Sequence, residues 1–211
     1  KVLPLFRRCG ALPLLVALPL YQCIDGYRFN DQHDNYLAYD YAVNTFRSLP
    51  HGAALFTWGD SGAFPLWYLQ GVERMREDLA LIHVPHLQFE WYLDGFPELF
   101  RSSVLRQPET RRRPLAQVLR LAEEEQLAVR PVFVDFSTRY SVDHGNYALH
   151  QRGICYGLGK GPKGAPAAVD VPVWGLYSLR GVSGRETAFL DVDSGKAVLI
   201  YGYSRMEGGQ S

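Results

Sequence analysis

The turn Gly59-Asp60-Ser61-Gly62 places a carboxylate and a hydroxyl side by side. It follows a short apolar run rich in strand formers, Ala53 to Trp58, and precedes Pro65, which is well placed as the first residue of a helix. At the end of a strand, Asp60 can accept hydrogen bonds from sugar hydroxyls or help to hold a cation, and the free N–H groups of the helix can bind an oxyanion. The alternative is that Asp60 only caps the helix, and residue type alone favours capping.

Three other patterns that suggest chemistry fail on their context or spacing. The letters of the Gly59–Gly62 turn also surround the nucleophile of chymotrypsin-like proteases, but that all-β fold requires an upstream His and Asp, whereas this turn joins a strand to a helix. His83 and His86 are separated by Pro85 at the end of a strand, so they do not share one helix face as a metal site requires, and we interpret them as ordinary loop histidines. Gly153–Gly161 departs from a phosphate-binding loop at its defining positions. The sequence therefore predicts neither a metal site nor a bound cofactor.

The Asp60 turn belongs to a predicted βαβ unit. Leu66, Leu69 and Val72 recur at helical spacing after it, and the apolar run Leu79 to Val84 follows as the next strand. In a doubly wound sheet, ligands lie beyond the carboxyl ends of the strands, which is where we expect Asp60. The sequence thus predicts an α/β fold, a three-layer, Rossmann-like sheet with helices on both faces and a less regular C-terminal part.

Apolar periodicity and turn residues place the other elements. We expect a polar, turn-like stretch at Asp25–Asp34, a helix at Tyr36–Leu49, a helical segment at Gln88–Arg101 broken near Gly95 and Pro97, a charged loop at Arg106–Pro114, a helix from Leu115 to near Gln126, and a buried strand at Pro131–Phe136. After these we expect a flexible loop at Gly157–Ala168 and strand-like segments at Val169–Val173 and Gly175–Leu179. Lys196–Tyr203 is ambiguous, because its residues suit a strand while Asp193 and Ser194 suit a helix cap.

Residues 1–24 differ from the rest of the chain. Arg7 and Arg8 precede an uncharged apolar run that contains Pro13 and Pro19. The run is short for a membrane span, which needs roughly 20 apolar residues. It fits the end of a transmembrane helix with the arginines on the cytoplasmic side, a signal peptide, or a buried proline-rich lead-in. Because no initiator methionine is present, we expect the chain to continue upstream, which favours the first interpretation.

Charge and composition narrow the class of partner. Lys and Arg together number 22, as do Asp and Glu, so the formal net charge is zero, and we expect no nucleic-acid partner because phosphate binding requires a basic footprint. The cluster Arg111–Arg113 precedes a helix, and we interpret it as a solvated turn. The 13 Tyr, 11 Phe and 4 Trp residues suit a large core or a carbohydrate-facing surface, and composition favours the core.

Two segments carry a family resemblance, N-Y-L-A-Y-D-Y-A-V-N-T-F-R-S-L-P at Asn35–Pro50 and A-L-F-T-W-G-D-S-G-A-F-P-L-W-Y-L-Q-G-V-E at Ala54–Glu73. They resemble the soluble region of a family of large polytopic membrane proteins of the GT-C glycosyltransferase type. The animal relative in that family is an endoplasmic reticulum protein O-mannosyltransferase that modifies IPT domains of plexins and related receptors. The resemblance is strongest over Tyr27–Phe96 and continues loosely through Arg130–Phe136 and the C-terminal segment.

The resemblance implies an organisation for the chain. Residues 1–24 would be the end of a transmembrane helix or a membrane-proximal lead-in, and residues 25–211 a soluble domain on the extracytoplasmic side, in the periplasm of a bacterium or the endoplasmic reticulum lumen of a eukaryote. The catalytic acid of GT-C enzymes lies near the first membrane helices. This chain would therefore be an accessory domain of a lipid-linked-sugar-dependent glycosyltransferase, which supports the membrane-spanning part of the same protein and helps to bind a glycan or protein acceptor.

The resemblance also indicates ligand-binding residues. They are Trp58, Asp60, Ser61, Trp67 and Tyr68 around the turn, and Asn35, Tyr39 and Asp40 in the first motif. The usual turn of the family reads roughly G-D-N-D-T-F-P-L-W-Y, so this chain departs from it at Ser61, Gly62 and Ala63. These changes remove the second carboxylate, so we expect weaker ligand binding at the turn.

The alternative function is a structural or protein-interaction module whose aromatic surface packs on the rest of its own membrane protein without binding a ligand. A free-standing hydrolase would need a nucleophile with a base in reach, and the sequence offers no convincing pair. We therefore do not expect this chain to be catalytic by itself, although it would be part of a glycosyltransferase that performs O-mannosylation.

Overall fold

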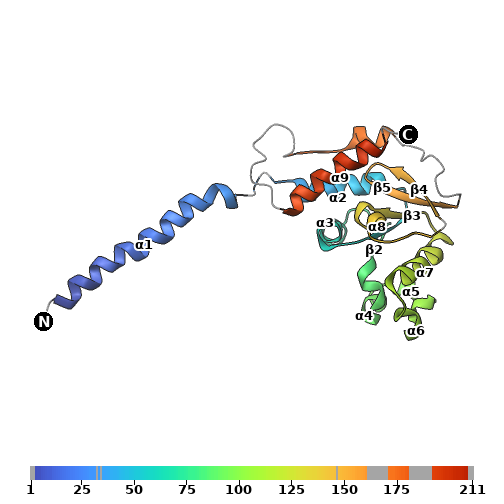
Figure 1. Ribbon diagram of the computed structural model, residues 1–211, viewed down its shortest axis with the longest axis horizontal. Helices are drawn as coiled ribbons and strands as arrows, with labels where there is room; N and C mark the ends of the chain where they lie inside the picture. The colour runs from blue at the N-terminus through green and yellow to red at the C-terminus, as the bar shows by residue number, and fades with distance from the viewer. Residues whose placement is uncertain are drawn as a thin grey trace.

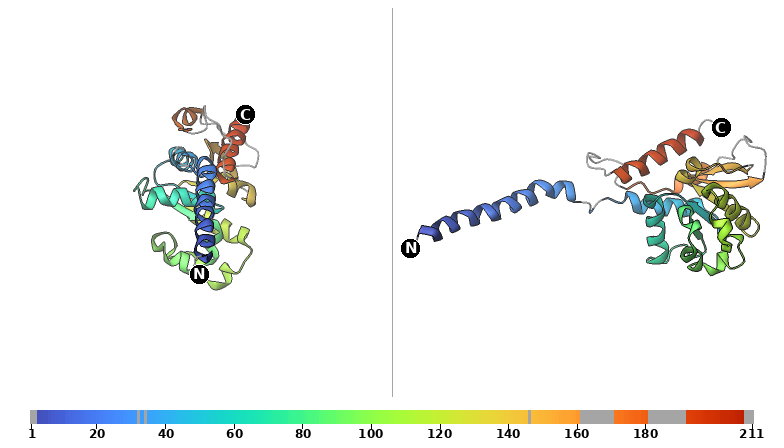
Figure 2. Two further views of the ribbon diagram at one scale, coloured as in Figure 1. Left: turned by 90° about the vertical axis from the view of Figure 1, so that its left-hand side faces the viewer. Right: turned by 60° about the horizontal axis from the view of Figure 1, so that its bottom comes forward.

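The computed structural model describes residues 3–31, 33, 35–145, 147–160, 171–180 and 192–208. Its first element, α1 (Leu3–Asn30), is a long helix that stands clear of the rest of the protein (Figures 1 and 2). The turn expected at Asp25–Asp34 is therefore wrong over residues 25–30, because polar residues suit an exposed helix as well as a turn. Within the described residues, none of the helices combines the length and the apolar character that crossing a membrane requires.

The body of the protein is built on a mixed, five-stranded sheet with the strand order β2-β1-β3-β5-β4. Its strands are β1 (Ala54–Thr57), β2 (Ala80–His83), β3 (Val132–Asp135), β4 (Tyr147–Arg152) and β5 (Cys155–Lys160). β1 pairs in parallel with both β2 and β3, so that Ala54 lies opposite Ala80 on one side and Val132 on the other. β5 runs antiparallel to β3 and to β4. The predicted α/β fold is thus confirmed.

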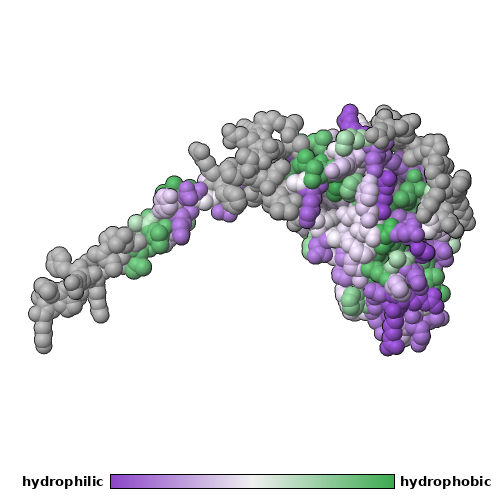
Figure 3. Space-filling view, viewed as in Figure 1, coloured by the Kyte–Doolittle hydropathy of each residue, from purple (hydrophilic) through white to green (hydrophobic). Residues whose placement is uncertain are grey.

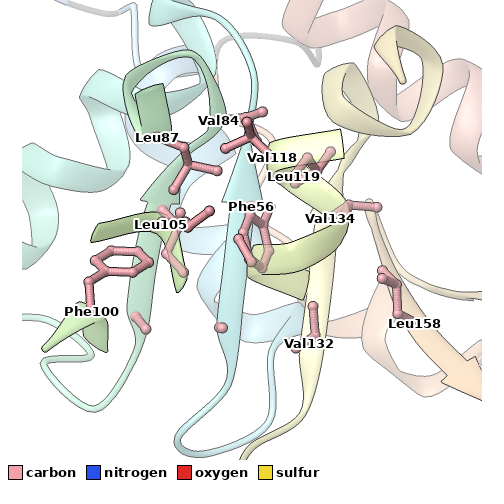
Figure 4. Close-up of a cluster of buried hydrophobic side chains, with 14 of the residues drawn as sticks. Phe56, Val84, Leu87, Phe100, Leu105, Val118, Leu119, Val132, Val134 and Leu158 are labelled. Atoms are coloured by element: carbon pink, nitrogen blue, oxygen red, sulfur yellow. The ribbon is translucent and has the colours of Figure 1, made fainter. Parts of the chain in front are cut away.

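Helices cover both faces of the sheet (Figure 1). One face carries α2 (Leu37–Ser48), α3 (Asp60–Gly71) and α9 (Val192–Gly208), and the other carries η1 (Val84–Gln88), α5 (Pro97–Phe100) and α7 (Leu115–Leu127). Successive residues of a strand alternate between these layers, so Phe56 packs with Val134 and Leu119 in one cluster (Figure 4), while Leu55 packs with Leu66 in the other. The three-layer arrangement follows from this alternation.

α3 begins five residues earlier than Pro65, at Asp60, which corrects the predicted start of this helix. Gly59 precedes it with φ +91°, a conformation that side-chain-bearing residues rarely adopt, and its carbonyl accepts from the N–H of Ala63 (3.1 Å). Pro65 lies inside the helix and cannot donate to the carbonyl of Ser61. Because Ser61 is exposed to solvent, that carbonyl lies where water can satisfy it.

The glycines of β5 led the sequence analysis to predict a loop where the structure has a strand. The loop expected at Gly157–Ala168 is wrong over residues 157–160, which form part of the strand, and residues 161–168 lie outside the described residues. A Cβ on Gly157 would lie 3.2 Å from the ring of Phe133, and one on Gly159 would lie 2.6 Å from the ring of His150. These glycines therefore serve close packing between strands rather than flexibility.

The C-terminal segments also differ from expectation. Of the strand-like segments expected at Val169–Val173 and Gly175–Leu179, residues 169 and 170 lie outside the described residues, and residues 171–176 form a short 3-10 helix, η3 (Val171–Leu176), instead. The ambiguous segment Lys196–Tyr203 is helical, within α9. The remaining elements are α4 (Glu90–Asp94), η2 (Val104–Arg106), α6 (Pro108–Arg111) and α8 (Phe136–Ser141).

The stretch Arg106–Pro114 is not a charged loop, and Arg111 is not part of a solvated turn. η2 and α6 occupy much of the stretch, and the side chain of Arg111 is buried. Its guanidinium donates to the carbonyls of Leu105 (3.0 Å) and Arg106 (2.7 Å) and to Glu90 (3.1 Å). Burial is tolerated because these acceptors satisfy the cation.

Arg76 joins the end of α2 to the start of β2. Its guanidinium donates to the carbonyls of Phe46 (2.6 Å), Leu49 (3.1 Å) and Pro50 (2.9 Å), which follow or end α2, and to both oxygens of Asp78. The hydrogen bonds from Arg76 hold the pKa of Asp78 far below its usual value. A lowered carboxyl pKa means that this stabilisation is present at neutral pH and is lost as the solution is made acidic.

We expect Arg76→Ala to lower the free energy of unfolding by about 2–4 kcal/mol at neutral pH, because it leaves several carbonyls and a carboxylate without their donor. Arg74→Ala is the matched control, because Arg74 and Arg76 both have a positive φ, but Arg74 pairs with Glu77 at the exposed surface (3.0 Å). Chemical denaturation measures both. Equal losses in the two variants would contradict the role of Arg76.

Candidate functional site

The carboxyl ends of β1 and β3 form the topological switch point of the sheet. From β1 the chain passes to β2 on one side, and it later enters β3 on the other side of β1. In open α/β sheets, ligands bind where the connections that follow two neighbouring strands lead in opposite directions. Asp60 follows β1 at this edge with its side chain 72% exposed, and Asp135 ends β3 and is buried. One carboxylate therefore faces solvent while the other lies in the interior.

The Asp135 carboxyl fixes the backbone just before Asp60 by hydrogen bonds. Its Oδ1 accepts from the N–H of Thr138 (2.6 Å), and its Oδ2 accepts from the N–H of Trp58 (3.4 Å). A Cβ on Gly62 would lie 3.3 Å from Oδ2 and 3.4 Å from Tyr41 Oη, so α3 approaches this carboxyl closely because Gly62 has no side chain. Burial raises the pKa of Asp135 to about 6. Asp135 therefore positions the edge and has no access to a ligand.

Asp60 faces a buried histidine. Its Oδ1 lies 4.0 Å from Nε2 of His83, the last residue of β2. Burial lowers the pKa of His83, and the neighbouring His86 lowers it further. At neutral pH the imidazole is consequently uncharged and forms no ion pair with Asp60.

A continuous set of aromatic rings adjoins this pair, and we call it the aromatic surface. It consists of Phe64 and Trp67 of α3, His86 of η1, Phe89, and Trp91 of α4. The ring centroids of Phe64 and Trp67 lie 5.5 Å apart, and those of His86 and Trp91 lie 5.3 Å apart. Phe64, Phe89 and Trp91 are at least half exposed. Contiguous exposed apolar surface is a common feature of interaction sites.

The candidate ligand-binding residues fall into two places. Asp60 and Trp67 lie together at the edge, with Ser61 exposed in the first turn of α3, while the backbone of Trp58 is bound to Asp135. Asn35 lies at the start of α2, where its side chain accepts from the N–H of Leu37 (3.2 Å).

The remaining candidates lie away from Asp60. Asp40 is buried and forms an ion pair with Arg180, whose Nη2 lies 2.6 Å from its Oδ1. The guanidinium of Arg180 covers the ring of Tyr36. Tyr39 donates to Glu73 (2.9 Å), and Tyr68 is about half exposed. The contacts of Asp40 thus hold α2 to the segment that contains Arg180.

Sequence reasoning missed His83, His86 and Trp91 at this site. The first two were interpreted as loop histidines, but His83 ends β2 and His86 lies in η1, with ring centroids 4.4 Å apart. A signal was present, since each of the apolar runs Leu79–Val84 and Pro131–Phe136 contains one polar residue next to its end, His83 in the first and Asp135 in the second. Residues that end neighbouring parallel strands meet at one edge of the sheet. Among the described residues, no group of three or more His, Cys, Asp or Glu side chains is arranged to hold a metal ion.

Comparison with known proteins shows that this site lies in a segment that matches a family model. Residues 38–103 match the family model described as TMEM260-associated domain 2. The chain is 30% identical over 82 residues to the protein O-mannosyl-transferase tmem260 of Dictyostelium discoideum, covering 38% of this chain and 10% of that protein. It is 33% identical over 73 residues to the protein O-mannosyl-transferase TMEM260 of Mus musculus, covering 35% of this chain and 10% of that protein.

These alignments thus span about a tenth of the length of either curated relative. No solved structure matches the chain. The matched segment contains β1, α3, β2 and α4, and with them Asp60, His83 and the aromatic surface.

The raised pKa of Asp135 predicts a specific pH dependence of stability. Folding favours the protonated carboxyl, so the free energy of unfolding falls as the pH rises through about 6, by about 3 kcal/mol for a shift of this size. In Asp135→Asn, the side-chain oxygen still accepts from Thr138 but cannot ionise. We therefore expect the stability of the variant relative to the wild type to increase by about 2 kcal/mol between pH 4.5 and 7.5, measured by urea denaturation.

Asp143→Asn is the control, because the side chain of Asp143 is 59% exposed. Its stability relative to the wild type is expected to change little over this interval. A stability difference between Asp135→Asn and the wild type that does not vary with pH would show that Asp135 is not destabilised by burial.

Proposed function

We propose that this chain is an accessory domain of a glycosyltransferase of the protein O-mannosyltransferase type, and that it binds a sugar or a protein acceptor without carrying the catalytic residue. The observation that carries the proposal is the exposed carboxylate of Asp60 beside the aromatic surface, both within the segment matched by the family model. The curated relatives that share this segment are named as protein O-mannosyl-transferases.

The chemistry of the edge suits binding. The Asp60 carboxylate accepts hydrogen bonds from hydroxyl groups, and hydrogen bonds to a charged group are stronger than those between neutral groups. The flat, exposed rings of Phe89 and Trp91 can stack on the apolar face of a sugar ring. Among the described residues at this edge, no Ser, Thr or Cys side chain is hydrogen-bonded to His83 or His86, so the arrangement offers recognition rather than an activated nucleophile.

α1 supports a place beside a membrane-spanning part of the same protein. It projects from the body, and it exposes apolar side chains such as Leu18, Tyr21 and Ile24 to solvent (Figure 3). We assign residues 1–24 to the end of a transmembrane helix or a membrane-proximal lead-in, and residues 25–211 to an extracytoplasmic domain. A catalytic centre that uses a lipid-linked sugar would then lie in the membrane-spanning part, where the lipid carrier has access, and this domain would present the acceptor or sugar.

A second candidate function is a packing module that binds no ligand. Leu199, Tyr203 and Met206 of α9 are each more than half exposed and lie on one face of the helix, pointing away from the buried Tyr201 and Ser204. This stripe favours contact between the body and another protein segment. In that case the aromatic surface would also be covered by the rest of the longer protein.

Titration of the full chain with methyl α-D-mannopyranoside and with short Ser/Thr-containing peptides distinguishes the two functions. Tryptophan fluorescence reports binding, because Trp67 and Trp91 lie in the aromatic surface. We expect Asp60→Ala and Trp91→Ala each to weaken binding by about tenfold or more, because each removes a main contact of the ligand.

Tyr203→Ala is the matched control, since Tyr203 is a similarly exposed ring on α9. It should leave the binding curve unchanged. No response of the wild-type chain to sugar or peptide at millimolar concentration, or equal binding by Asp60→Ala, would contradict the binding role and favour the packing module.

A further inference from the structure

His83 is a buried imidazole that contacts both parts of the candidate site. It is only 2% exposed. Its ring centroid lies 4.4 Å from that of His86 and 5.5 Å from that of Trp67, and its Nε2 lies 4.0 Å from Asp60 Oδ1. Its backbone N–H donates to Tyr92 Oη (2.8 Å), which fixes the end of β2. A change in the charge of His83 therefore acts on both the Asp60 carboxylate and the aromatic surface.

The ring nitrogens of His83 are unusual for a buried group. Neither Nδ1 nor Nε2 has a hydrogen-bond partner among the described residues. A neutral imidazole has one donor and one acceptor nitrogen, and an unsatisfied buried polar group typically costs about 1–3 kcal/mol. Such a cost in a folded protein calls for an explanation. At its present separation from Asp60, Nε2 is one short displacement from a strong, charge-assisted hydrogen bond.

Three of the elements around His83, namely α3, η1 and α4, each contribute one titratable group, whereas β1, whose Thr57 pairs with His83, contributes none there. These are Asp60 of α3, His86 of η1 and Tyr92 of α4. Burial raises the pKa of Tyr92 to about 12, so its hydroxyl stays neutral in the range of interest. Asp60 favours the charged form of His83, whereas burial and His86 oppose it. Asp60 is consequently the negative charge that a protonated His83 would meet.

We propose that His83 and Asp60 form a proton-controlled latch. With His83 neutral, the Asp60 carboxylate stays at the rim and is free to accept hydrogen bonds. When His83 takes up a proton, its imidazolium draws the carboxylate inward into an ion pair, and the rim loses its acceptor. The consequence for a ligand rests on the proposed function of Asp60, but the movement of the proton and of the carboxylate does not.

The direction of the pH dependence follows from burial. Because the pKa of His83 lies below its ordinary value of 6.5, the latch is open at neutral pH and closes only in more acidic solution. The unfolded chain binds this proton more readily than the folded chain, so protonation of His83 also lowers the stability of the fold as the pH falls. Ligand affinity should decline as His83 is protonated in the folded chain, and the contribution of His83 to stability falls with the pH, opposite in sign to the contribution of Asp135.

Titration of the ligand-free chain tests the latch directly. The Cε1–H resonance of His83 in the wild-type protein should titrate below pH 6.5, and the fluorescence of Trp67 should be quenched in step, because a protonated imidazole quenches an indole in contact with it. We expect Asp60→Asn to move the His83 transition to lower pH. His83→Gln should remove that phase of the quenching, and Trp67→Phe should abolish its amplitude.

His51→Gln is the matched control. His51 Nε2 also lies 4.0 Å from a carboxylate oxygen, that of Asp78, but the side chain of His51 is 91% exposed. This variant should keep the quenching phase unchanged. A His83 resonance that titrates as in an unfolded peptide, or one that Asp60→Asn leaves unmoved, would overturn the latch. If His83→Gln fails to fold, the His83 resonance in the wild type and in Asp60→Asn still decides the test.

Binding of methyl α-D-mannopyranoside at pH 7.5 and pH 5.0 tests the consequence. Wild-type affinity should fall at the lower pH to that of Asp60→Asn, and the ratio of the two affinities should approach one in His83→Gln. A wild-type affinity that is equal at both pH values, with His83 shown to be protonated at the lower one, would overturn the withdrawal of the carboxylate. If no variant binds the sugar at either pH, the proposed function fails for this ligand, while the ligand-free titration still decides the latch.

Discussion

Asp135 joins two backbone segments that the sheet itself does not pair, and a third segment packs closely against it. β1 and β3 are paired along their length, but the segments that follow their carboxyl ends are no longer joined by the hydrogen bonds of the sheet. The Asp135 carboxyl bridges this gap by accepting from Trp58 after β1 and from Thr138 after β3, while Gly62 lets α3 approach it. The geometry of the candidate site therefore depends on a single acidic group that is itself out of reach of solvent.

The site combines a rigid base with an exposed rim. Phe56, Leu55 and Ile82 beneath it are fully buried, whereas Asp60, Phe89 and Trp91 above it are largely open to solvent. Rigid elements position a few exposed groups in this way in many α/β binding sites, because strands cannot shift without breaking the packed layers. This site differs in having a buried histidine between base and rim, and neither ring nitrogen of that histidine has a hydrogen-bond partner among the described residues.

The C-terminal part completes the fold around α2. Asn44, which is fully buried, donates to the carbonyl of Ser178 (2.7 Å) and to the hydroxyl of Tyr201 (2.8 Å). Asp40 binds Arg180 in the same region. The family model ends at residue 103, so Asp40 and Asn44 of α2, which it covers, obtain these partners from segments outside the matched region. Two of the polar residues in the first motif thus have a structural explanation in this chain.

The sequence by itself determined the elements whose signal lies within one segment. Apolar runs identified β1, β2 and β3, and periodic burial identified α2 and α7, because each pattern records which side of its own element faces the interior. The same logic placed Asp60 at the end of a strand. Only the tertiary structure decided what depends on neighbours from distant segments. It showed that the glycines of β5 make room for Phe133 and His150, that Asp40 meets Arg180, and that His83 lies under an aromatic surface beside Asp60. Periodicity contains no record of these contacts, since the groups that meet are brought together only when helices and strands pack.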